Sequence, residues 1–148
     1  MSRELKVRAL DRDLEIMVYS DKRNKSTYDI NYEFAMNEKG VLVCNWHEDT
    51  EDYYGNFKEA NGTLDNLMQY TGLKDKNGKE IYEGDILSIK IYSGDKVIVE
   101  GKTVVEFKDG CFGVIWGHDK AFLSLNSFFK AKFEVIGNIY ENPELLRG

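Results

Sequence analysis

The sequence predicts one mainly β domain, built as an antiparallel barrel or a strongly curved sheet with one or two short helices. Apolar and polar residues alternate over much of the chain, with the period of a half-buried strand. Turn-forming residues separate these stretches at short intervals. Aromatic residues make up 13% of the 148 residues and proline occurs once, a composition that favours strands. The length is that of a single ordinary domain, so we expect residues 1–148 to share one core.

Two hairpins are expected in the first third of the chain. Residues 4–10 alternate, the polar segment 11–13 forms a short turn, and residues 14–19 form a second strand. Residues 30–36 and 41–46 form the next pair, joined by a four-residue turn at 37–40.

The segment 47–62 breaks this pattern. Acidic residues and glycines replace the alternation, so we expect an exposed acidic and aromatic loop. After it, Thr63 is expected to cap a short helix over residues 64–68. Asn77 and Gly78 accept positive φ and predict a tight turn between residues 70–73 and 81–82.

The last third predicts an antiparallel meander. A strand over residues 86–92 is followed by turns at 93–95, 100–101 and 108–110, and strands continue to Trp116. Residues 122–129 fit either a strand or a short helix, and residues 132–140 form the last strand. Asn142, Pro143 and Glu144 are a capping residue, a first-position proline and a favourable acid, so Leu145 and Leu146 should lie on a helical turn. The order of strands after Gly84 is similar to the start of a small SH3-like barrel, an analogy of architecture alone.

Several blocks of the chain resemble one protein family. QYTGL at residues 69–73, DKNGKEI at 75–81, YEGD at 82–85 and VIGNIYENPELL at 135–146 closely resemble the YopX family, and LKVRA at the N-terminus resembles its first strand. Leu10 departs from the pattern, because family members commonly have tryptophan there. The resemblance implies a β-rich protein encoded by phages or prophages, with no assigned biochemical role. Residues 20–65 lie outside the resembling blocks.

Composition excludes several classes of protein. A net charge of −6 argues against a phosphate-binding surface over most of the molecule, although a local basic patch is compatible with it. Two cysteines do not make a disulfide-stapled secreted module. The N-terminus is polar, and no apolar run reaches the length of a membrane span. We therefore expect a cytoplasmic protein without a membrane partner.

Metal binding has weak support in the sequence. Cys44 and His47 have the spacing of two zinc ligands, and Cys111 with His118 could complete four, but the second pair is spaced wrongly for a tight knuckle. Cys44 lies in an apolar run, so a buried thiol is the preferred interpretation. The acids Glu48, Asp49, Glu51 and Asp52, and the segment 75–78, lack the spacing of a calcium loop. No cofactor or metal is expected.

Catalysis has no clear signature either. The chain lacks a G-x-S-x-G elbow and has only two histidines, His47 and His118. Residues 101–103 spell the end of a phosphate-loop motif, but Lys96 stands where its first glycine is required, so a strand is preferred. Asp85 follows Gly84 before a strand and is expected to fix a turn rather than act as a functional acid.

The favoured function is therefore a non-catalytic module that binds a protein partner or a second copy of itself. Tyr53, Tyr54 and Phe57 are the candidate contact residues, since adjacent aromatics in an exposed acidic segment suit an interface. A flap packed over the barrel is the equal alternative for them. The second hypothesis is single-stranded nucleic-acid binding by a barrel face with aromatics beside four lysines, Lys90, Lys96, Lys102 and Lys108. An enzyme is the third.

Overall fold

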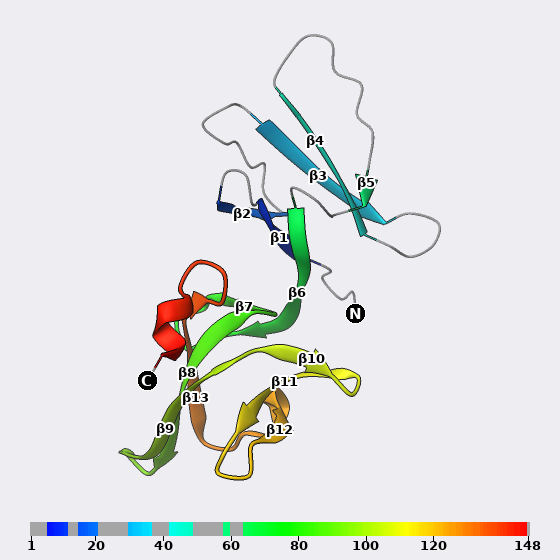
Figure 1. Cartoon of the computed structure of the whole chain (residues 1–148). Coiled ribbons are helices and arrows are strands. Elements are labelled where there is room, and N and C mark those ends of the chain that lie inside the picture. The colour runs from blue at the N-terminus through cyan, green and yellow to red at the C-terminus, as the bar shows by residue number, and fades with distance from the viewer. Residues whose placement is uncertain are drawn as a thin grey trace. The chain divides into compact units, whose positions relative to one another are not determined.

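The computed structural model describes residues 6–11, 15–20, 30–36, 42–48, 58–59 and 64–147. These residues form thirteen strands and two 3₁₀ helices, which confirms the mainly β prediction with short helices. Every pair of neighbouring strands is antiparallel. The chain divides into two compact units, one over residues 4–69 and one over residues 70–148 with residues 1–3 (Figure 1). The single domain expected from the length stays a prediction.

The first unit contains both expected hairpins. Strand β1 (Val7–Asp11) pairs with β2 (Ile16–Tyr19), and Ala9 lies opposite Val18, both fully buried. Strand β3 (Ile30–Met36) pairs with β4 (Leu42–Glu48).

Two parts of the segment 47–62, where a loop is expected, belong to strands. Strand β4 continues to Glu48, and β5 (Lys58–Glu59) pairs with it. The residues between them lie outside the described part of the chain.

The helix expected over residues 64–68 is wrong. These residues begin strand β6 (Leu64–Lys74), whose first part pairs with β1, so that Arg8 lies opposite Met68. Burial alternates along it, with Met68 and Tyr70 buried and Gln69 between them half-buried. A helix of fewer than two turns is marginal in water, so pairing with a strand that lies far away in the sequence decides the conformation.

The second unit is built from two three-stranded sheets that curl as a half-barrel, which confirms the expected strongly curved sheet. One has the order β13-β8-β9 and the other β10-β11-β12 (Figure 1). Strand β7 (Glu80–Tyr82) pairs with the second part of β6. The remaining bounds are β8 (Asp85–Ser93), β9 (Lys96–Val104), β10 (Glu106–Lys108), β11 (Cys111–Trp116), β12 (Ala121–Ser124), η1 (Leu125–Ser127), β13 (Ala131–Asn138) and η2 (Pro143–Leu146).

Two of the three turns expected in the meander are present, at 93–95 and 108–110, where Gly94 and Gly110 have positive φ. The turn expected at 100–101 is wrong, because both residues lie inside β9. A Cβ at Gly101 would come 3.1 Å from the Trp116 ring, so glycine marks a close approach here. The order is also not a simple meander, since the last strand β13 pairs with β8.

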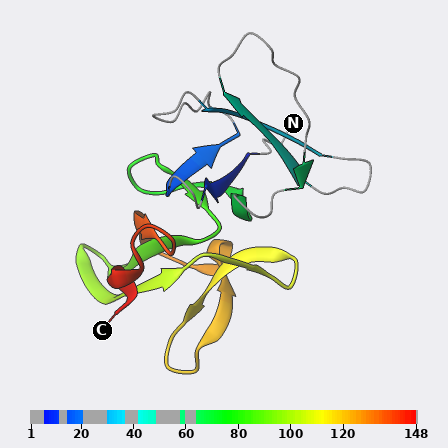
Figure 2. The ribbon, with the colours of Figure 1, turned by 45° about the horizontal axis from the view of Figure 1, so that its top comes forward.

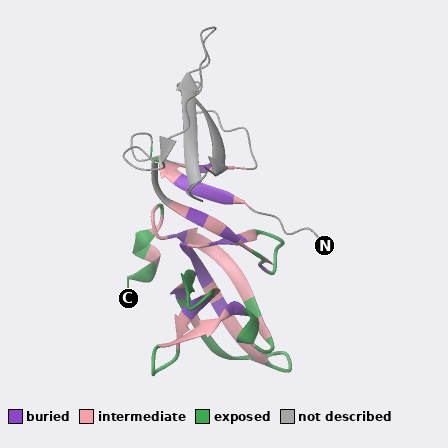
Figure 3. Ribbon diagram, turned by 90° about the vertical axis from the view of Figure 1, so that its right-hand side faces the viewer, coloured by how far each residue is buried: buried purple, intermediate pink, exposed green. Residues whose placement is uncertain are grey.

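The core of this unit lies between the two sheets. Leu87 and Ile89 of β8 alternate with half-buried polar residues and are fully buried, together with Val114 of β11. Figure 3 colours the buried residues of the described chain purple. Three aromatic side chains, Trp116, Phe128 and Phe133, pack against this cluster in successive edge-to-face contacts with ring centroids 5.6 Å apart.

The stretch 122–129, which fits a strand or a short helix, contains both. Strand β12 ends at Ser124 and the short helix η1 follows, and the Ser124 hydroxyl accepts a hydrogen bond from the Asn126 N–H. The helical turn expected after Asn142 is confirmed as η2. Asn142 does not cap it through its side chain, which instead accepts from the Asn138 N–H at 3.2 Å. No helix in the described ranges is long and apolar enough to cross a membrane.

Candidate interaction site

The candidate contact residues Tyr53, Tyr54 and Phe57 lie outside the described residues. Their role as a contact surface stays a prediction, as does the alternative of a packed flap.

The four potential zinc ligands are not all described. His118 is exposed on the turn between β11 and β12, and the half-buried Cys111 thiol donates a long hydrogen bond of 3.6 Å to the Lys108 carbonyl. The side-chain positions of Cys44 and His47 on β4 lie outside the description. Within the part of the chain where side chains are described, no three His, Cys, Asp or Glu side chains converge on a metal-sized site.

The phosphate-loop fragment at 101–103 lies inside β9, near its end, so it is neither a loop nor the start of a helix. Thr103 is 8% exposed. Its hydroxyl donates to the Ile115 carbonyl at 2.9 Å, which connects β9 to β11. This residue therefore serves the fold.

Asp85 has the structural role expected of it. It is 2% exposed, and its Oδ2 accepts a hydrogen bond from the Tyr82 N–H at 2.8 Å across the turn between β7 and β8. Its backbone carbonyl accepts from the Val105 N–H at 2.9 Å.

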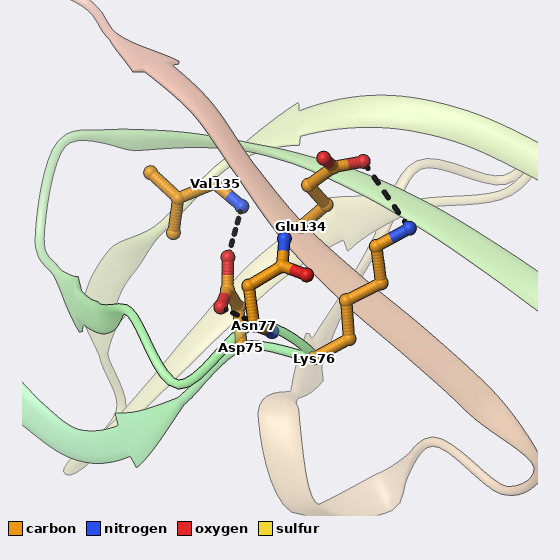
Figure 4. A network of polar contacts seen from close by, with 5 residues as sticks. All are labelled: Asp75, Lys76, Asn77, Glu134 and Val135. Atoms are coloured by element: carbon orange, nitrogen blue, oxygen red, sulfur yellow. Dashed lines mark hydrogen bonds and ion pairs between the residues drawn. The ribbon is translucent and has the colours of Figure 1, made fainter.

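Asp75 is the centre of a second polar network, shown in Figure 4. Its Oδ1 accepts from the N–H groups of Asn77 at 2.8 Å and Lys79 at 2.9 Å, and its Oδ2 accepts from the Val135 N–H of β13 at 2.9 Å. Burial raises the pKa of this carboxyl, but the three hydrogen bonds and the Lys79 charge outweigh burial and hold the pKa below its ordinary value. All three bonds come from backbone N–H groups, two in the turn after β6 and one in β13, so this acid organises the turn and joins it to β13.

The feature that the sequence analysis missed is the exposed apolar stretch at the start of β9. Val97, Ile98 and Val99 are 41%, 58% and 45% exposed. In the described part of the chain β9 pairs only with β8, so one edge of the strand is open. Open apolar edges are templates for a further strand. The signal was present as three consecutive β-branched residues beside a turn, without the alternation of a half-buried strand.

A groove of about 800 Å³ continues along this strand. It is lined by residues 99–104 of β9, by Trp116 and the turn that follows β11, and by Leu146 of η2. Figure 2 shows the β8–β9 hairpin, the β11–β12 hairpin and η2 in the same unit. The lining combines apolar side chains with two acids, Glu100 and Glu106, and two lysines, Lys102 and Lys120. A groove of this kind suits an extended chain that is partly apolar and partly charged.

A smaller pocket of about 390 Å³ lies at the other end of the hairpin, lined by Tyr92, Gly94, Asp95, Lys130, Ala131 and Lys132. The Lys132 ammonium lies 5.0 Å from the centroid of the Tyr92 ring. Of the four lysines expected to form a nucleic-acid surface, Lys90, Lys96 and Lys102 belong to the β8–β9 hairpin. Lys90 lies opposite Glu100, and Lys108 belongs to β10 of the other sheet.

Comparisons of the sequence and of the structure with known proteins agree on one family. The family described as YopX protein matches residues 6–147. The crystal structure of protein yopX from Bacillus subtilis is similar with a TM-score of 0.67 and 26% identity, over 95% of this chain and 97% of that chain. The structure of protein EF1440 from Enterococcus faecalis gives a TM-score of 0.57 and 28% identity, over 98% and 99%. A search of curated proteins gave no match.

Proposed function

Because the chain belongs to the YopX family, we propose that it is a non-catalytic interaction module of phage or prophage origin, which binds an extended protein segment along the open edge of β9. It acts in the cytoplasm of the bacterial host. The observation that carries the proposal is the exposure of Val97, Ile98 and Val99 on a strand whose second edge is paired with none of the described strands. Such an edge binds a partner through main-chain hydrogen bonds, and neighbouring side chains select the sequence.

The test is affinity purification from infected host cells, with cross-linking to map the contact, using the full chain and two variants. Ile98→Lys adds a charge to the open edge, and we expect the partner and its cross-links to β9 to be lost. Phe129→Lys is the matched control, because Phe129 is 78% exposed and lies outside β9. Both sites are exposed, so neither change should alter stability by more than about 0.5 kcal/mol. A partner that binds the Ile98→Lys variant with unchanged cross-links would refute the proposal.

The segment with Tyr53, Tyr54 and Phe57 is proposed as a second contact of the same module. Replacing the three residues with alanine should weaken capture without removing the cross-links to β9. Unchanged capture would assign no binding role to these aromatics.

Single-stranded nucleic-acid binding is the second candidate function, favoured by the pocket where Tyr92 lies beside Lys130 and Lys132. An aromatic ring between cations can stack a base while the lysines contact phosphates. The expected result is retention of short oligonucleotides that weakens as salt rises and is lost in Lys130→Glu. Absence of retention at low salt would eliminate this function.

A further inference from the structure

The hydrogen-bonding direction of β9 follows from its pairing with β8. Next to the last pair of the ladder, Ile86 and Val104, the Val105 N–H donates to the Asp85 carbonyl and the Val105 carbonyl accepts from the Gly84 N–H, both at 2.9 Å. Both backbone groups of Val105 therefore point to the β8 side. Bonded and non-bonded pairs alternate in an antiparallel ladder. The N–H and C=O groups of Val99, Gly101 and Thr103 therefore point to β8, and those of Glu100 and Lys102 point to the open edge.

The groove beside this edge has the size of a short strand. A strand residue fills roughly 160 Å³, from a rise of about 3.4 Å, a strand spacing of about 4.8 Å and a sheet spacing of about 10 Å. The groove of about 800 Å³ therefore holds about five residues. Trp116 and Leu146 both line the groove, so an isolated extended segment fits it better than the edge of a second folded sheet.

Charge defines the order of side chains in that segment. Glu100 and Lys102 are exposed, lie two residues apart and therefore share one face of β9. A residue directly opposite each would have its Cβ about 5 Å away, where opposite charges attract and like charges repel. The residue between them lies opposite Gly101 on the other face, where the Trp116 ring is in close contact with the strand. An apolar side chain suits that position.

We propose that the partner segment is an antiparallel strand whose side chains, from its N-terminus to its C-terminus, are acidic, apolar and basic. This proposal rests on the proposed function. Its acid lies opposite Lys102 and its base opposite Glu100, because the two strands run in opposite directions. Antiparallel pairing is the geometry of this sheet and the more stable one per residue.

Two blocked pentapeptides of identical composition test the order: acetyl-Val-Glu-Val-Lys-Val-amide and acetyl-Val-Lys-Val-Glu-Val-amide. With the full chain, we expect the first to bind about tenfold more tightly, since two attractive pairs replace two repulsive ones. Binding is measured by chemical-shift titration, and slowed amide exchange at Glu100 and Lys102 locates the peptide on the edge. Methylation of the alternate peptide nitrogens that face β9 should abolish binding.

A double variant, Glu100→Lys with Lys102→Glu, should reverse the preference between the two peptides. The matched control is Lys132→Glu with Glu134→Lys, which exchanges the same charges two residues apart on β13, at the opposite end of the same sheet. It should leave the preference unchanged. Tighter binding of the second peptide to the natural chain, or a preference that the double variant does not reverse, would overturn the inferred order. In that case slowed exchange at β9 would still support strand addition, whereas no protection by either peptide would remove the proposed function as well.

Discussion

Replacing Asp75 should separate the contribution of its buried network from that of the exposed ion pair beside it. Asp75→Asn keeps one side-chain oxygen, which can still serve the N–H groups of Asn77 and Lys79, but places an NH₂ group against the Val135 N–H. Leaving a partly buried donor without an acceptor costs about 1–3 kcal/mol, so we expect a loss of about 2 kcal/mol in the free energy of unfolding. Asp75→Ala removes all three bonds, and the loss should rise to about 3–4 kcal/mol.

The stability that the Asp75 carboxylate contributes should depend on pH. The pKa of Asp75 is lowered in the folded protein, so the folded state binds its proton less readily than the unfolded chain, whose pKa is about 3.9. The stability from the carboxylate is present above about pH 4 and is lost as pH falls through the folded pKa. The difference in stability between the natural chain and Asp75→Asn should therefore narrow between pH 6 and pH 3.

The assay is urea unfolding followed by Trp116 fluorescence, in a Trp46→Phe background so that the signal reports on the second unit. Glu134→Gln is the control, because it removes the Lys76–Glu134 ion pair of 3.5 Å, whose side chains are 39% and 41% exposed. Such a pair is worth about 0–1 kcal/mol. Equal losses in Asp75→Asn and Glu134→Gln, or a difference that does not change with pH, would refute the reasoning.

Two further predictions concern packing in the same unit. Ile89→Ala removes a fully buried side chain from the core cluster, and the unfolding free energy should fall by about 2–5 kcal/mol; a loss below about 1 kcal/mol would show that the neighbours fill the space. Gly113→Ala places a Cβ against the Leu123 carbonyl oxygen and 2.7 Å from Phe122 Cζ, so the β11–β12 pair must shift, and the thermal midpoint should fall by an amount that corresponds to about 1–3 kcal/mol. An unchanged midpoint in Gly113→Ala would contradict the close approach of these strands.

Most of the hairpins could be predicted from the sequence because a hairpin depends on residues close together in the chain. The turn with Asn77 and Gly78 was predicted from residue chemistry, and it is present with Gly78 at a φ of +81°, although Asn77 does not have positive φ. The Asp75 carboxylate supplies the rest of that turn by accepting from Asn77 and Lys79. The candidate interaction site was not predicted, since the exposure of Ile98 depends on which strand pairs with β9.

The strand period, the positions of most turns and the family could be predicted from the residues alone. These depend on residues near one another in the chain, where side-chain alternation and backbone preference act directly. Three features came from the fold: residues 64–68 form a strand, β13 pairs with β8, and β9 pairs with β8 alone among the described strands. Each of these is a pairing between distant segments, and such pairings are selected by burial in a shared core rather than by local preference.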